Sequence, residues 1–202
     1  MTFRALGQQF RLMKHYFIAS TLVFVAGIYL GFVEADRFQQ FLDSQLKELG
    51  HIAQALSEKE HSQLWFFGFI FLNNTIKAIF VVFAGAFFGL LPLLFLITNG
   101  MILGYLGAQQ QIADHGVTLL KGILPHGIIE IPALIIACAF GLRIGLNVLK
   151  AIFSVMKPGR SGSAGELKSL IRATVPLSGL LVILLFIAAV IESTVTFWLL
   201  AP

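Results

Sequence analysis

The sequence has very few charged residues and a single cysteine. Only 12% of its 202 residues are charged, whereas 57% are hydrophobic. A soluble domain carries about twice that charged fraction and could not keep so much apolar surface out of water. The lone Cys138 excludes a disulfide framework. The chain also has no phosphate-binding loop, paired-cysteine motif or nucleic-acid module, so we expect no nucleic-acid partner.

Long apolar runs make up most of the chain instead. A membrane-spanning helix needs about 20 mostly apolar residues. Five segments qualify, at about residues 16–33, 64–90, 93–107, 123–146 and 175–199. The third is short and contains Asn99 and Gly100, which leaves a tilted or broken helix as an alternative to a plain span. Transmembrane β-barrels alternate apolar and polar residues, and this sequence does not. It therefore predicts an all-α, polytopic transmembrane helical bundle, a single multi-pass domain of the cell membrane over residues 1–202.

The connecting segments differ in charge. The N-terminal arm has Arg4, Arg11 and Lys14 but no acidic residue, and loop 147–174 is also basic. Loop 34–63 has six acidic residues against three basic ones. Because basic loops remain in the cytoplasm, we expect the N-terminus and loop 147–174 inside, and loop 34–63 and the C-terminus outside.

The acidic loop 34–63 also has a helical pattern. Apolar residues recur along one face, among them Phe38, Leu42, Leu46 and Ile52. This spacing predicts an external amphipathic helix, or two helices divided at Gly50, lying on the membrane surface or capping the bundle.

Polar residues inside the predicted spans require an explanation, because ionisable groups are costly in a bilayer. They are Asn73, Asn74, Lys77, Asn99, His126, Glu130 and Glu192. At about 1.5 Å of helix rise per residue, most of these groups fall in the outer half of the bilayer. Lys77 lies one helical turn deeper than Asn73 on the same face. The depths predict one polar cluster formed by several helices.

His126 and Glu130 are four residues apart and so share one helix face. With Glu192 from the last span they supply one nitrogen and two carboxylate ligands, enough for a divalent metal such as zinc. Simpler interpretations stay open. His126 is also explained as an interfacial residue, Glu130 and Glu192 as a structural pair bridged to Lys77, and the asparagines as interhelical hydrogen-bonding groups.

Several stretches resemble the stage II sporulation protein M family of membrane proteins. They are "FLNNTIKAIFVVFAGAFFGLLPLLFLITNGMILGY", "LPHGIIEIPALIIACAFGLRIG" and "AAVIES". The matching positions are Asn73, Asn74, Asn99, Gly100, His126, Glu130, Pro132 and Glu192. The resemblance implies a bundle with five spans and the C-terminus outside. With its PHGIIE-type signature, the chain is most similar to the broader branch of the family, which is spread among non-sporulating bacteria and archaea. The namesake of the family anchors and organises peptidoglycan hydrolases during forespore engulfment without being a hydrolase itself, and the resemblance implies a comparable scaffold role.

The leading hypothesis is therefore a non-enzymatic membrane scaffold of this family. We expect it to be homo-oligomeric in the lipid bilayer, to organise cell-wall hydrolases, and to carry a divalent metal at His126, Glu130 and Glu192. The alternative is an intramembrane metal-dependent enzyme with Glu130 or Glu192 as general base. A small ion- or proton-coupled transporter is a second alternative, although no inverted repeat is visible in the sequence.

Overall fold

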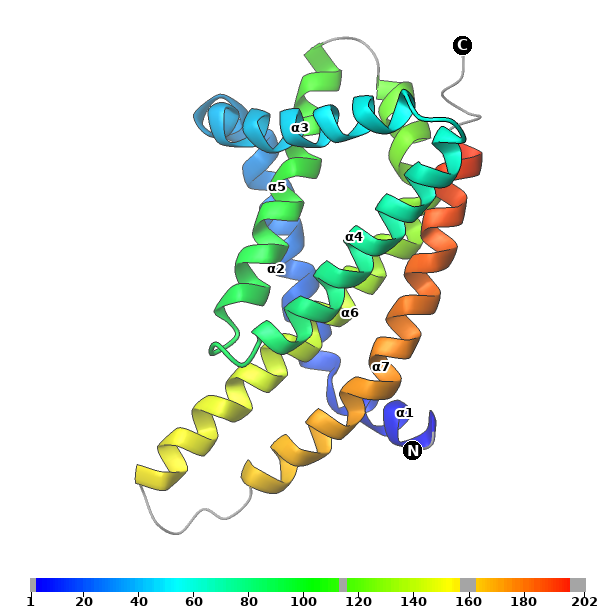
Figure 1. Ribbon diagram of the computed structural model, residues 1–202. Helices are drawn as coiled ribbons and strands as arrows, with labels where there is room; N and C mark the ends of the chain where they lie inside the picture. Colours follow the sequence, from blue (N-terminus) through cyan, green and yellow to red (C-terminus); the bar gives the residue numbers. More distant parts are fainter. Residues whose placement is uncertain (1–2, 113–115, 157–162, 197–202) are drawn as a thin grey trace.

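The described part of the chain is helical throughout its regular structure. The computed structural model describes residues 3–112, 116–156 and 163–196, and no strand occurs within these ranges (Figure 1). The elements are α1 (Phe3–Leu12), α2 (Lys14–Val33), α3 (Ala35–Ser57), α4 (Ser62–Ala84), α5 (Leu90–Ile112), α6 (Gly116–Met156), α7 (Ser163–Ile191) and the π-helix η1 (Glu192–Thr196).

Five of these helices, α2, α4, α5, α6 and α7, are long and apolar enough to cross a membrane. Their outward surfaces are apolar too. Leu22, Ile76, Phe80 and Ile183 are each more than half exposed, as is expected of side chains that face lipid rather than water. These features confirm the prediction of a polytopic helical membrane protein.

The second and third spans have different bounds from those predicted. The second was expected to continue to residue 90, but α4 ends at Ala84 and a turn over residues 85–89 leads into α5. Gly89 has a φ of +77° in this turn, a conformation that glycine adopts without steric cost. Helix α5 then runs through Asn99 and Gly100 without interruption, so the third span is not broken.

Two segments expected to be a loop, or a divided helix, differ from the prediction. The predicted basic loop 147–174 is mostly helical, because α6 continues to Met156 and α7 begins at Ser163. Helix α3 passes through Gly50 undivided. Hydropathy marks where an apolar run ends. Helix propagation adds one backbone hydrogen bond per residue whatever the side chain's polarity, so a helix can outlast its apolar run.

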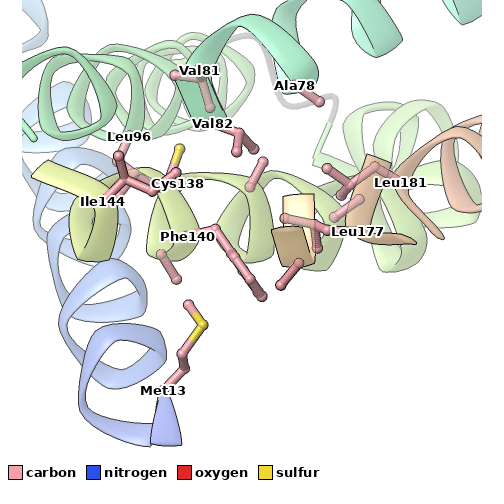
Figure 2. Packing of buried hydrophobic residues seen from close by; sticks show 14 of the residues in the cluster. Met13, Ala78, Val81, Val82, Leu96, Cys138, Phe140, Ile144, Leu177 and Leu181 are labelled. Carbon is pink, nitrogen blue, oxygen red and sulfur yellow. The ribbon is translucent and has the colours of Figure 1, made fainter. Parts of the chain in front are cut away.

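Helix α6 is the centre of the bundle. In an 18-residue apolar stretch of its span 56% of residues are buried, against 22% in the corresponding stretches of α2 and α4 and 33% in those of α5 and α7. Figure 2 shows Phe140 of α6 between Met13 and residues of α4 and α7 such as Val82 and Leu177. Helices α4 and α7 are therefore both positioned against the central helix α6.

Helices α2 and α5 pack with their backbones in contact. A Cβ added to Gly27 would lie 2.7 Å from the carbonyl oxygen of Ile97, and one added to Gly104 would overlap the carbonyl oxygen of Ile28. Gly31 and Gly100 are similarly close to the opposite backbone. Small residues at four-residue spacing allow such close approach between membrane helices.

Helix α3 crosses one end of the bundle, over α4 and α5, while α1 lies at the opposite end (Figure 1). Leu42 of α3 packs on Met101 and Tyr105 of α5 in a small buried cluster. The Tyr105 hydroxyl donates a hydrogen bond to Asp43 Oδ1 at 2.6 Å, which adds a polar attachment beside the apolar one. The predicted amphipathic helix therefore exists and caps the bundle.

Candidate intramembrane site

A cavity of about 1010 Å³ lies between α4 and α5, with α3 across one end and α6 behind it. Its polar wall contains most of the residues that the sequence singled out. They are Asn73, Asn74, Lys77, Asn99, Glu130 and Glu192. Residues separated by more than 100 positions in the chain thus face the same space.

Asn74 and Glu130 form the closest link across this wall. Nδ2 of Asn74 on α4 donates a hydrogen bond to Oε1 of Glu130 on α6 at 3.0 Å. Nδ2 of Asn73 donates in turn to Oδ1 of Asn74 at 3.3 Å. Glu130 is half-buried, so its carboxylate is partly satisfied by the amide and still borders the cavity. The pair joins two spans and also presents a carboxyl group to the cavity.

Asn99 and Lys77 occupy other positions on the cavity lining. Nδ2 of Asn99 donates to the carbonyl oxygen of Phe95 at 2.7 Å, one turn back in its own helix. That bond satisfies the amide within α5, so Asn99 contributes polarity without crossing to another helix. Lys77 is exposed and follows Asn74 by one turn of α4 on the same face.

Glu192 enters from the end of α7, where the chain changes from α-helix to the π-helix η1. Next to it, the carbonyl oxygen of Ser193 accepts a hydrogen bond of 2.9 Å from Nε2 of Gln63, at the start of α4. This bond fixes the end of α7 against α4. Glu192 is half-buried and has a polar interaction of its own. Single π-turns are frequent where helices carry functional groups.

The predicted metal ligands are only partly placed. Glu130 and Glu192 line one cavity, but the side chain of His126 lies outside the described part of the structure. Among the side chains that are described, no group of three or more His, Cys, Asp or Glu residues is arranged to hold a metal ion. The zinc site at His126, Glu130 and Glu192 stays a prediction.

Helix α3 contributes residues that the sequence did not identify as part of a site. Gln45, Glu48 and Ile52 border the cavity from above the polar wall. The amphipathic pattern predicted the helix, but nothing in it indicated which spans α3 would cover. Gly27 and Gly31 have the four-residue spacing typical of packing glycines, and both lie against the backbone of α5.

Comparison with known proteins identifies the chain's relatives. The family model described as "Stage II sporulation protein M" matches residues 20–197. The uncharacterized protein MJ0793 of Methanocaldococcus jannaschii is 29% identical over 186 residues, which cover 91% of this chain and 95% of the relative. A second uncharacterized protein of that organism, MJ0706, is 29% identical over 54% of this chain and 47% of its own length. No solved structure matches. Because the family model covers most of the sequence, the chain belongs to the stage II sporulation protein M family.

Proposed function

We propose that the protein is a membrane scaffold that docks cell-envelope partners, cell-wall hydrolases among them, on the polar face of α3. The supporting observation is the attachment of α3. A surface helix held to the bundle by Leu42 and by the bond between Asp43 and Tyr105 has a fixed position relative to the membrane spans. Such a helix can hold a partner at a defined height above the bilayer.

The outward face of α3 has the chemistry of a protein-binding surface rather than of a membrane anchor. Asp36, Arg37, Gln40 and Lys47 border a shallow hollow of about 590 Å³ and are exposed. Charges of both signs alternate there, which favours specific electrostatic pairing over general attraction to anionic lipid. The apolar face of the same helix is used against α5, so the polar face is the one that remains for a partner.

Site-specific photocrosslinking in intact cells tests the scaffold. A photoreactive residue at Gln40 on α3 is compared with one at Lys168, an exposed position at the start of α7. We expect a cell-wall hydrolase to crosslink at residue 40 and not at residue 168, and Lys47→Glu to reduce that product. The scaffold proposal fails if no hydrolase is captured at residue 40, or if both positions capture the same proteins.

The carboxylates of the cavity support a second proposal, the divalent-metal site at His126, Glu130 and Glu192 that an intramembrane enzyme would use as a Lewis acid. The supporting observation is that Glu130 and Glu192 line one cavity. Elemental analysis of protein purified without added metal tests it, with His126→Ala and Glu130→Gln as variants and Glu58→Gln as the exposed control. We expect stoichiometric metal that both variants lose. A metal-free wild type would rule out both the site and the enzyme.

A further inference from the structure

The cavity is open on the side that faces the bilayer. Phe80 of α4 and Leu94 of α5 both line it, and they are 63% and 51% exposed. Both residues belong to helices long and apolar enough to span the membrane, so we infer that their exposed surface faces hydrocarbon. Helices α4 and α5 diverge from their connecting turn and leave the cavity between them (Figure 1). A ligand can therefore enter sideways from the membrane.

The lining is amphipathic, which favours an amphipathic occupant. Apolar side chains such as Ile70, Ile102 and Leu103 surround the polar wall. A volume of about 1010 Å³ lies at the upper end of the ~300–1,000 Å³ of small-molecule sites. That space suits a polar head and the first part of its hydrocarbon chains, with the rest of the chains in the bilayer.

Polar and apolar groups that line the cavity lie at successive levels along α4. Asn74, Lys77 and Phe80 succeed one another at three-residue spacing and line the same cavity, each about 4.5 Å further from the α3 end. Glu130 lies at the level of Asn74, to which it is hydrogen-bonded. Glu48 belongs to α3 itself and lines the cavity at that end. Among the polar groups, the order from that end inward is therefore the carboxyl groups of Glu48 and Glu130 and then the Lys77 ammonium, with the apolar Phe80 beyond it.

We propose that the cavity binds a zwitterionic glycerophospholipid whose headgroup ends in a primary ammonium, of the phosphatidylethanolamine type. The order of its groups complements the order of the wall. The ammonium faces Glu130 and Glu48, the phosphate faces the Lys77 ammonium, and the chains leave past Phe80. An anionic headgroup of the phosphatidylglycerol type would place hydroxyl groups, without positive charge, beside the carboxylates. This binding does not depend on the scaffold role, which uses other residues of α3, those that border the outer hollow.

Native mass spectrometry of the purified protein tests the proposal. The protein, in a mild detergent, is supplied with equal amounts of phosphatidylethanolamine and phosphatidylglycerol of identical chains. We expect the wild type to retain the former in about tenfold preference, as a hydrogen-bonded ionic contact provides. Glu130→Gln should remove most of this preference. Lys77→Gln should weaken both lipids alike, because both have a phosphate. Glu58→Gln, exposed and outside the cavity, should change nothing.

A second variant keeps the test valid if the loss of Glu130 disturbs the fold. Thr98→Phe fills the cavity from the α5 side and leaves the bond between Asn74 and Glu130 intact. We expect it to displace lipid of either headgroup while the protein still elutes as a single species. Equal retention of the two lipids by the wild type would overturn the proposal. So would retention unchanged by Thr98→Phe, or an equal loss of preference in Glu58→Gln.

Discussion

Helix α5 has very different surroundings on its two sides. Gly100 and Gly104 place one side in backbone contact with α2, so that even a methyl group would not fit between the helices. The other side borders the cavity through residues such as Thr98, Asn99 and Ile102. One helix thus combines close backbone packing on one side with an open cavity on the other.

The two sides of α5 depend on each other. Lipid tails are as apolar as leucine, so membrane helices associate through close packing and hydrogen bonds rather than through a hydrophobic driving force. The glycine contacts with α2 hold α5 in place without support from α4. Because α2 holds α5, α4 can diverge from α5 and leave the cavity between them (Figure 1). Substitutions on the glycine side should therefore affect stability, and substitutions on the cavity side mainly binding.

The largest effect is expected from Gly104→Ala. Its Cβ would overlap the carbonyl oxygen of Ile28, and backbone cannot move aside as a flexible side chain can. We expect a loss of about 2 kcal/mol or more in the free energy of unfolding, at the upper part of the range for overpacked sites. Thermal or denaturant unfolding in detergent measures it.

Gly68→Ala is the matched control, because a Cβ at Gly68 meets nothing within 4 Å. There the substitution should be neutral or stabilising by up to about 1 kcal/mol, since alanine is the better helix former. Gly104→Ala is thus expected to lower the free energy of unfolding, and Gly68→Ala is not. If Gly104→Ala were as well tolerated as Gly68→Ala, the close packing of α2 on α5 would be wrong.

The sequence predicted the spans well but not where the chain turns between them. Five apolar runs are sufficient to identify five membrane helices, because the bilayer sets their length. The turn at residues 85–89 lies within an uninterrupted apolar stretch, so hydropathy contains no signal for it. The polar ends of α6 and α7 lie in the predicted loop 147–174, because a helix can continue beyond the end of its apolar run and hydropathy does not mark that continuation.

The site was predicted in part, because polar residues in apolar runs are conspicuous. Asn74, Lys77, Glu130 and Glu192 were selected on that basis, and the structure places them on one cavity wall. The shape of the cavity could not be predicted. It depends on the divergence of α4 from α5 and on the position of α3, which are tertiary features with no local sequence pattern.

A smaller effect is expected from Asn74→Ala, which removes the hydrogen bond between α4 and Glu130. Side-chain hydrogen bonds between membrane helices contribute about 1 kcal/mol, so we expect a loss of that size in the free energy of unfolding. Asn73→Ala is the control, because Asn73 donates only to its neighbour Asn74 in the same helix. A double-mutant cycle with Glu130→Gln isolates the pair. Additive losses would show that Asn74 and Glu130 do not interact.

The smallest global effect is expected from Tyr105→Phe. The substitution keeps the ring that packs on Leu42 but removes the hydroxyl that donates to Asp43 and accepts from Gln109. Stability should fall by about 1 kcal/mol or less. The local effect is more informative. Because the bond attaches α3 to α5, its loss should accelerate amide hydrogen exchange in α3 and leave α6 unchanged. Tyr29→Phe, at an exposed position on α2, should change neither the free energy of unfolding nor the amide hydrogen exchange of α3. Unchanged exchange in Tyr105→Phe would mean that the apolar contact of Leu42 alone holds α3 over the cavity, and that α3 does not need the polar attachment to serve as a fixed platform.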